Sequence, residues 1–538
     1  MLTKIKSVLP IILILCLALF FRAYHIGSYP SLNPDEAAIG YDAYSLLLTG
    51  KDEHGASWPI HFKSFGDYKP GGYFYLVMPF VKLLGLTPLA VRLPNLILSV
   101  TSVYFIYLLV KLLSGRKYLA LSVAFVLAVN PWHIHFSRGG WESDAALSLI
   151  IIGTYFFFKY LKTSRLSYFF YFVLCFVYSL YTYHSARLIA PLLVFSLVFI
   201  YSKHLFSDYK KLLLPVFIGI LLCIPVVFSF LHNGGTARFG GVGLTADQGP
   251  VWRANELLNQ HGNVKLFNRV IHNKRLLYVI SWAQKYSSHF DFNYLFLNGD
   301  EVPRSKVPEM GQFYLIELPL LLFGLFVLLR RDYFDKKVRT FIIAWILIAP
   351  VASSLTFQAP SALRSLPLTV PFCILIGLGL FELINLIQKK YFLIGLIGLF
   401  YIFSITYYFD AYFNHYQKRL PYSWNYGFSE LVDYVAPIKS NYRDIYVTDK
   451  YDQPYILFLF FSRYNPVSIQ QEIKLTQPDQ YGFSTVRSFS NYHFGKIDSF
   501  NISPNSLIIA SDTDNFPGLP QKVINFPNGL PAFKIYTR

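Results

Sequence analysis

Eleven long apolar runs constrain the fold of this chain more than any other feature of its sequence. An α-helix needs about 20 apolar residues to cross the hydrocarbon core of a bilayer. Charged residues make up only 14% of the 538 residues, whereas soluble domains carry about 25%. We therefore predict an all-α polytopic membrane protein with about 11 transmembrane helices. The runs cover residues 7–26, 91–110, 119–136, 144–161, 167–183, 186–202, 212–231, 313–329, 340–357, 366–387 and 391–409.

The basic residues predict which side of the membrane each loop faces. Lys and Arg gather in every second loop, and such loops are typically cytoplasmic. This pattern also accounts for the net charge of +18 without a nucleic-acid partner. The N-terminus is then cytoplasmic, and the C-terminus is extracytoplasmic. The basic clusters are Lys111, Arg116 and Lys117; Lys159, Lys162 and Arg165; Lys203, Lys210 and Lys211; Arg330, Arg331, Lys336, Lys337 and Arg339; and Lys389 with Lys390.

A twelfth apolar segment, Tyr73 to Leu84, is too short to count as a span. It has only 12 residues and contains Pro79 and Lys82. Counting it as a span would invert every later loop and put the basic clusters outside. We therefore predict an interfacial helix on the outer side. The outer loops are then 27–90, 137–143, 232–312 and 358–365.

The last part of the chain has a different pattern and is predicted to be a separate domain. Short apolar stretches at 444–449, 506–511 and 532–536 are typical of strands, and 453–464 is typical of a helix. Their alternation indicates a small α/β domain. We predict a transmembrane catalytic domain over 1–409 and an extracytoplasmic α/β domain over 410–538.

Charged residues of the outer loops are candidates for chemistry, because they lie close to the predicted membrane surface. A carboxylate there can take a proton from an acceptor, while cations hold a phosphate. The competing structural interpretation is that Asp35 caps the helix that follows it. The candidates are Asp35 and Glu36 in "NPDEAAIGY", Tyr68 and Lys69 in "FGDYKPGG", Arg138, Glu142 and Asp144 in "FSRGGWESD", and Arg364.

Several motifs in a fixed order resemble one glycosyltransferase group. After the outer "DE" pair come "YKPGGYFY", an "RLPN" helix start, "NPWHIHFSRGGWESDAAL", "YTYHSARLIAPL" and "NYLFLNGDEVPRSKVPEMGQFYLIELP". This set is similar to the bacterial GT-C glycosyltransferases of the protein O-mannosyltransferase-like and aminoarabinose-transferase-like group, the family 39/83 type. The resemblance covers about residues 1–409.

The resemblance implies roles for individual residues. Asp35 corresponds to the catalytic carboxylate of the family, and Glu36 is its neighbour. Lys69, beside Tyr68, corresponds to the ligand of the lipid phosphate. Glu142 stands where the family has a second functional acid, with Asp144 as the alternative. The remaining candidates are Arg138 and Arg364. We expect them to stabilise the phosphate charge, because they are outer-loop cations.

The function implied is that of an inverting glycosyltransferase, a hexosyl- or pentosyltransferase in the cell membrane. The donor is a polyprenyl-phosphate sugar, and the acceptor, whether protein, lipid or glycan, is extracytoplasmic. We expect no cofactor and no metal, and a divalent metal at the carboxylates is the less favoured alternative. A metal-dependent oligosaccharyltransferase or a polysaccharide-assembly protein also stays open, and chelator sensitivity would separate the metal-dependent enzyme. A transporter is less favoured, because it predicts charges at helix centres.

Overall fold

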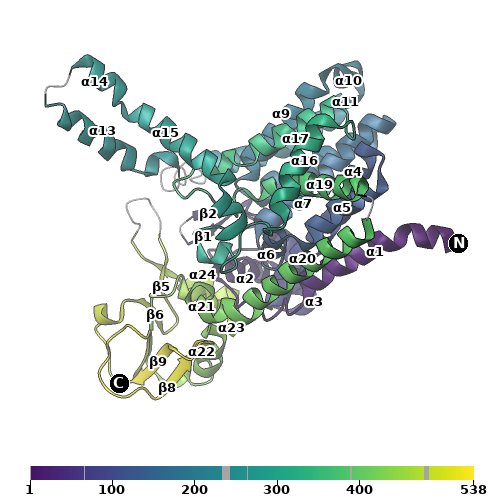
Figure 1. Ribbon diagram of the computed structural model, residues 1–538. Coiled ribbons are helices and arrows are strands. Elements are labelled where there is room, and N and C mark those ends of the chain that lie inside the picture. Colours follow the sequence, from purple (N-terminus) through teal and green to yellow (C-terminus); the bar gives the residue numbers. More distant parts are fainter. Residues whose placement is uncertain (1, 66, 233–242, 263–264, 388–389, 478–483) are drawn as a thin grey trace. The chain divides into compact units, whose positions relative to one another are not determined.

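The computed structural model describes residues 2–65, 67–232, 243–262, 265–387, 390–477 and 484–538 (Figure 1). The predicted outer loop 232–312 is therefore described in part, and Lys389 lies outside the described residues. The chain forms two compact units. Unit 1 comprises Met1–Ala18, Ser99–Phe136 and Ala146–Ser404, and unit 2 comprises Leu19–Leu98, Ser137–Ala145 and Ile405–Arg538. The domain boundary predicted at 409 stays a prediction.

Unit 1 is helical, and several of its helices continue into unit 2. Those lying wholly in unit 1 are α5 (Lys117–Val129), α8 (Leu166–Thr182), α9 (Ala186–Ile200), α10 (Ser202–Ser207), α11 (Tyr209–His232), α13 (Gly249–Gln260), α14 (Leu266–Ile271), α15 (Lys274–Ser287), α16 (Glu317–Arg330), α17 (Lys336–Ile348), α18 (Val351–Ser354) and α19 (Thr369–Leu386). The helices shared by both units are α1 (Leu2–Ala23), α4 (Pro88–Ser114), α6 (Pro131–Ser137), α7 (Glu142–Thr163) and α20 (Lys390–Asp410).

Glycines determine how closely the central helix α19 of unit 1 packs. A Cβ atom on Gly379 would lie 2.1 Å from the Leu320 carbonyl oxygen of α16. A Cβ on Gly377 would lie 2.6 to 2.8 Å from Val123 of α5. Small residues allow such backbone approach where the hydrophobic effect does not drive helices together. The α19 span is accordingly 89% buried.

Helices cover most of each of the eleven apolar runs, which confirms the predicted multi-pass helical architecture. The runs 119–136 and 340–357 each fall on two consecutive helices. Among the described residues, six helices are long and apolar enough to cross a membrane, or seven if the bent pair α5–α6 is one span. The segments Val8–Ala23, Leu166–Thr182 and Ala186–Ile200 are apolar but shorter. The predicted count of eleven spans therefore stays a prediction.

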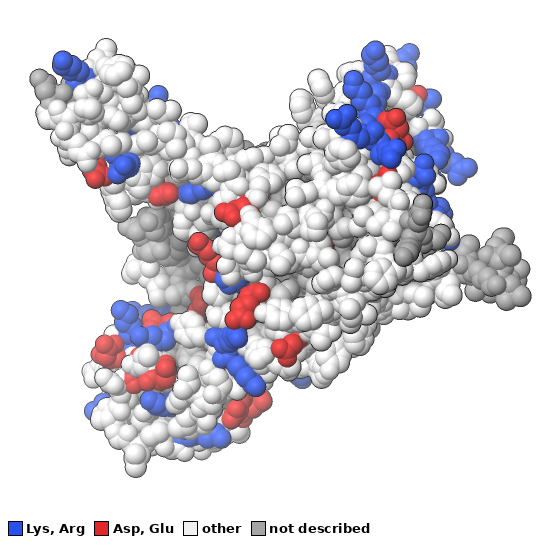
Figure 2. All heavy atoms as spheres, in the orientation of Figure 1, with Lys and Arg blue, Asp and Glu red and all other residues white. Residues whose placement is uncertain are grey.

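The loops predicted to be cytoplasmic contact one another in unit 1. The guanidinium of Arg116 lies 4.5 Å from the ring centroid of Tyr333, and Lys337 Nζ lies 5.2 Å from that of Tyr201. Figure 2 shows Lys and Arg side chains gathered at this end of the unit, around α10 and α11. The charge pattern of the sequence thus corresponds to one physical end of the helix bundle.

The end of the predicted span 119–136 contacts two of the loops predicted to be outer, 232–312 and 358–365. Trp132 Nε1 donates to the carbonyl of Ala362 at 3.0 Å. His135 Nε2 lies 2.8 Å from the carbonyl oxygen of Arg304. Segments 130–136, 300–312 and 358–365 therefore meet within unit 1, and the orientation of these loops in the membrane stays a prediction.

Unit 2 contains the predicted α/β domain, so this part of the fold is confirmed. Its seven-stranded sheet has the order β4-β5-β6-β3-β7-β9-β8, and β3 is parallel to both β6 and β7. The strands are β3 (Asp444–Thr448), β4 (Lys474–Leu475), β5 (Val486–Phe489), β6 (Tyr492–Gly495), β7 (Ser506–Ala510), β8 (Lys522–Asn525) and β9 (Pro531–Thr537). The helices of this part are α21 (Tyr416–Arg419), α22 (Phe428–Val435), α23 (Pro454–Ser462) and α24 (Pro466–Glu472).

The rest of unit 2 is built around helix α2 (Pro34–Thr49), which follows the predicted first outer turn. A short antiparallel hairpin, β1 (His61–Ser64) and β2 (Asp67–Pro70), precedes α3 (Gly72–Leu84), the predicted interfacial helix. A Cβ on Gly40 would lie 2.6 Å from the Phe460 ring and 2.7 Å from Val91. Helix α2 is thus held closely between α23 and α4.

The predicted topology can be tested with reporters. A reporter that functions only outside the cytoplasm should be active when fused after Arg538 and inactive when inserted in residues 331–335, because the second site lies in a basic loop. Measured activity at both sites checks this. A cytoplasmic C-terminus would mean that the span count is even, with Tyr73 to Leu84 as the first segment to reconsider.

Candidate functional site

The N-terminus of α2 is capped by Asn33, not by Asp35. The Asn33 side chain accepts a hydrogen bond from Glu36 N at 3.0 Å, and Glu36 Oε2 accepts one from Asn33 N at 3.2 Å. These reciprocal bonds form a capping box, and Pro34 occupies the first turn. The structural interpretation of Asp35 as the cap is therefore wrong, and its carboxylate is available for another role.

Asp35 forms an ion pair with Lys69. Lys69 Nζ donates to Asp35 Oδ1. The Asp35 side chain is 34% exposed and that of Lys69 is 14% exposed, so the pair lies at the border of the interior. Two residues 34 positions apart, one on a helix and one on strand β2, are thus brought together as the resemblance implies.

The surroundings of Lys69 restrict where its ammonium can lie. Strand β2 pairs with β1, with Lys69 opposite Phe62. The ammonium lies 5.1 Å from the ring centroid of Phe65, a distance at which the π-electrons attract a cation. The backbone N–H groups of the first turn of α2 add positive potential beside the pair. Tyr68 is half-buried on the same strand.

Glu36 forms a second ion pair, with Arg92, and both side chains are fully buried. Arg92 Nε and Nη2 donate to its two carboxylate oxygens at 2.7 and 2.8 Å, and Gly140 N donates to Oε1 at 2.8 Å. Arg92 Nη1 also donates to the carbonyls of Ile26 and Pro30 at 2.8 and 3.0 Å. Glu36 therefore joins α2, α4 and the 139–140 turn, and its side chain is only 1% exposed.

Arg138 also lies in the interior. It is 1% exposed, and its guanidinium donates to the carbonyls of Phe21, Arg22, Tyr24 and Tyr29 at 2.7 to 3.3 Å. These carbonyls include the end of α1, where a helix leaves acceptors without helical partners. In the structure this side chain holds the turn after α1, and the expectation that Arg138 receives phosphate charge stays a prediction.

The two candidates for the second acid begin α7, and Arg364 belongs to unit 1. Glu142 is 9% exposed, whereas Asp144 is fully buried. Of the two, Glu142 is thus the one closer to solvent. Arg364 Nη1 lies 3.4 Å from Thr356 Oγ1 and 3.3 Å from the carbonyl of Gln358, and these contacts place it in the 356–364 turn.

Sequence reasoning missed Asp42, a buried acid of α2 that lies next to Glu53. Glu53 itself is an outer-loop acid that the sequence suggested to be structural. Asp42 Oδ1 accepts a hydrogen bond from Glu53 N at 2.9 Å, and Tyr455 OH donates to Glu53 Oε1 at 2.9 Å. Burial raises the pKa of Asp42, and it raises that of Glu53 to about 8, while the Lys69 charge acts in the opposite direction. Asp42 follows Asp35 by seven residues, which places both on one helix face. That spacing was the available signal for Asp42.

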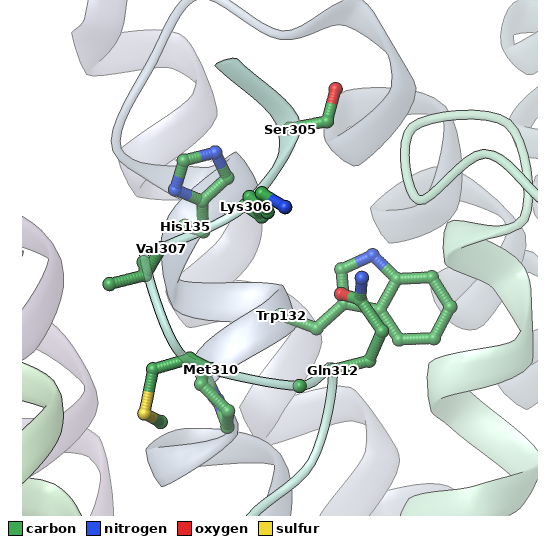
Figure 3. Close-up of a pocket in the computed structure, with 9 residues that line it drawn as sticks. Trp132, His135, Ser305, Lys306, Val307, Met310 and Gln312 are labelled. Atoms are coloured by element: carbon green, nitrogen blue, oxygen red, sulfur yellow. The ribbon is translucent and has the colours of Figure 1, made fainter. Parts of the chain in front are cut away.

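No resident metal is indicated by the described side chains, among which no group of three or more His, Cys, Asp and Glu could hold an ion. The prediction of a metal-free reaction stays a prediction. In unit 1, a small cavity lies between Trp132, His135 and Gln312 (Figure 3). Its volume is about 10 Å³, roughly the space for one water molecule. It is therefore too small to be a substrate site.

The Glu36–Arg92 pair should be essential for stability. Arg92→Met should lower the free energy of unfolding by about 3–5 kcal/mol, because it leaves a buried carboxylate without its counter-charge. The double variant Glu36→Gln/Arg92→Met should recover part of this loss. Thermal unfolding in detergent measures both, with Lys211→Met in the exposed Lys211–Asp208 pair as the matched control. Equal stability of Arg92→Met and the control variant would show that the pair is dispensable.

The comparisons with known proteins agree with this architecture. A family model described as dolichyl-phosphate-mannose-protein mannosyltransferase matches residues 68–228. The structure of ArnT from Cupriavidus metallidurans bound to undecaprenyl phosphate matches with a TM-score of 0.55 at 11% identity, covering 98% of this chain and 97% of that chain. No curated protein matches the sequence.

A further solved structure, the oligosaccharyltransferase AglB from Archaeoglobus fulgidus in complex with an inhibitory peptide and a dolichol-phosphate, has a TM-score of 0.49 at 13% identity. It covers 86% of this chain and 64% of that chain. The predicted resemblance is confirmed by the family match and by the ArnT fold. The chain is similar to the GT-C glycosyltransferases of the protein mannosyltransferase and ArnT type, with the multi-pass membrane fold of that group.

Proposed function

We propose that this protein is a glycosyltransferase that moves a sugar from a polyprenyl-phosphate donor to an acceptor on the extracytoplasmic face of the cell membrane. The observation that carries the proposal is the Asp35–Lys69 pair at the N-terminus of α2. The pair combines a partly exposed carboxylate, which can remove a proton, with a cation beside a helix N-terminus, which can bind a phosphate. The ArnT match supports the lipid donor, because that structure contains undecaprenyl phosphate.

The reaction is a single displacement at the anomeric carbon. The acceptor oxygen or nitrogen forms a bond to this carbon while Asp35 takes the acceptor proton. The bond from the anomeric carbon to the phosphate oxygen breaks, and its electron pair leaves with the polyprenyl phosphate. Attack from the face opposite the leaving group inverts the configuration. Lys69 and the positive end of the α2 dipole stabilise the charge on the departing phosphate.

The ion pair gives this mechanism an order of events. Before the donor binds, the ammonium of Lys69 is held by Asp35. The phosphodiester of the donor carries one negative charge, as a carboxylate does, and its oxygens compete for the same ammonium. The polyprenyl phosphate that departs is a monoester with a charge of about −1.5 to −2, so the ammonium binds it more strongly than it binds the carboxylate. Donor binding therefore releases the Asp35 carboxylate, so that the base is available when the sugar is in place.

The other predicted site residues then take supporting roles. Glu36, with its bidentate Arg92 contact, orients the first turn of α2 and does not react. Glu142 is the candidate for contact with the acceptor, and Asp144 remains its alternative. Tyr68 lies beside the phosphate ligand, and Arg364 remains a candidate for phosphate contact. In the membrane we place the N-terminus in the cytoplasm and the C-terminus outside.

Replacement of the proposed base should abolish turnover. Asp35→Asn should reduce sugar transfer by about 100- to 10,000-fold, because the amide cannot accept the proton. Expression and undecaprenyl phosphate binding should persist, since Asn33 caps the helix. Mass spectrometry of envelope glycans in a strain lacking the native protein measures transfer, with Asp67→Asn on β2 as the charge-matched control. Undiminished sugar transfer by Asp35→Asn would show that Asp35 is not the base.

Replacement of the proposed phosphate ligand should weaken donor binding. Lys69→Ala should bind undecaprenyl phosphate about 10- to 100-fold more weakly, because a hydrogen bond to a charged group contributes about 1.5–3 kcal/mol. Lys69→Arg should recover part of the affinity, since it keeps the charge with a different geometry. Binding can be followed by native mass spectrometry, with Lys63→Ala on β1 as control. If Lys69→Ala binds like the control, Lys69 is not the phosphate ligand.

A further inference from the structure

Helices α13, α14 and α15 of unit 1 form a helical hairpin that extends away from α16 and α17 (Figure 1). Its outward surface is unusually apolar for a segment outside the helix bundle. Leu266 and Phe267 are 80% and 71% exposed, and Trp252 is 71% exposed. The further exposed apolar side chains are Val270, Ile271, Leu276, Val279 and Ile280. We call these eight residues the apolar face of the hairpin.

The apolar face follows helical periodicity. On α15, Leu276, Val279 and Ile280 have the spacing of residues that share one helix face. On α14, Leu266 and Val270 are likewise four residues apart. In the described part of this segment the helices are therefore amphipathic, and one apolar side is left uncovered by the chain itself.

The C-terminal part of α15 attaches the hairpin to the bundle. Trp282 Nε1 donates to Ser354 Oγ at 3.1 Å, and Tyr286 OH donates to the carbonyl of Leu347 at 2.7 Å. Ser354 is the last residue of the candidate membrane span Lys336–Ser354, and Leu347 lies about two helical turns before that end. The end of a span marks the level of the membrane–water interface, where Trp and Tyr are enriched. The hairpin therefore begins at the membrane surface.

The net positive charge of the hairpin indicates what kind of partner covers its apolar face. Between residues 249 and 287 the sequence has six Lys and Arg residues and one acidic residue, Glu256. Figure 2 shows Lys and Arg at the far end of the hairpin and an uncharged surface along most of its length. This outer loop is long enough, at 232–312, to escape the rule that keeps Lys and Arg inside. Its positive charge thus needs another explanation.

We propose that the hairpin lies on the outer surface of the membrane, with its apolar face among the acyl chains and its Lys and Arg side chains on anionic phospholipid headgroups. Helices that combine an apolar face rich in Trp, Phe and Leu with a basic polar face bind membranes in this way. The ligand class is an anionic phospholipid of the bilayer. This surface is separate from the Asp35–Lys69 site, and the inference does not depend on the proposed reaction.

Lipid quenching in the full-length protein tests the proposal. The four native cysteines are replaced by Ser, and a fluorescent label is attached at Val270→Cys or Ile280→Cys. The protein is placed in nanodiscs of phosphatidylcholine with or without phosphatidylglycerol, each containing brominated lipid. The label should be quenched more strongly with phosphatidylglycerol. The matched control is a label at Asn259→Cys, an exposed polar position of α13, which should stay unquenched.

Charge removal tests the headgroup contact. Replacing Arg269, Lys274 and Arg275 by Gln should lower the ratio of docked to undocked hairpin roughly fivefold per residue, down to the phosphatidylcholine level. Hydrogen exchange of the native protein gives a second measurement that needs no cysteine variants. Amides of residues 265–285 should exchange more slowly in nanodiscs with phosphatidylglycerol.

Three results would overturn the proposal. A label that is unquenched in both membranes, with unchanged hydrogen exchange, leaves a protein partner or a second copy of the chain as the occupant. Equal quenching in both membranes removes the anionic headgroup as ligand. Loss of quenching on addition of undecaprenyl phosphate assigns the basic residues to the donor lipid.

Discussion

The bidentate ion pair between Glu36 and Arg92 is the contact on which the proposed site depends. Both side chains are buried, so each requires the other to offset the cost of leaving water. The same carboxylate binds Gly140 N and completes the cap of α2 with Asn33. One acid therefore sets the position of the helix turn that carries Asp35. The two adjacent acids of the "DE" pair thus differ: Glu36 holds the helix turn, and Asp35 is the base that we propose.

The C-terminal domain contributes to the same arrangement. Phe460 of α23 packs where Gly40 has no side chain, and Tyr455 hydrogen-bonds to Glu53. The ring of Phe65 contacts Tyr455 and also lies below the ammonium of Lys69. The α/β domain therefore forms a wall of the site around α2 and β2. Its removal would leave the Asp42–Glu53 group and the underside of Lys69 exposed to water.

Burial of like charges beside Lys69 also has a chemical consequence. Burial raises the pKa of both acids, Asp42 and Glu53, and it raises that of Glu53 to about 8. A neutral Glu53 leaves the Lys69 charge less compensated from that side. The ammonium is then held by Asp35 until a phosphate replaces it, which is the order of events that we propose for the donor.

The apolar periodicity and the alternation of basic loops in the sequence determined the helical membrane architecture, and short apolar stretches determined β3, β7 and β9. These are local signals, because a helix or strand depends mainly on its own residues and on the solvent that it faces. The "DE" and "YKP" motifs also predicted that Asp35 and Lys69 share a site. Only the tertiary structure decided the tasks of Glu36 and Arg138, since their partners are Arg92 and the carbonyls of 21–29. It also decided that Tyr455 reaches Glu53, 402 residues away. Such contacts form when distant parts of the chain pack together. The sequence shows that a side chain is charged, but it does not show whether that side chain will face water or a buried partner.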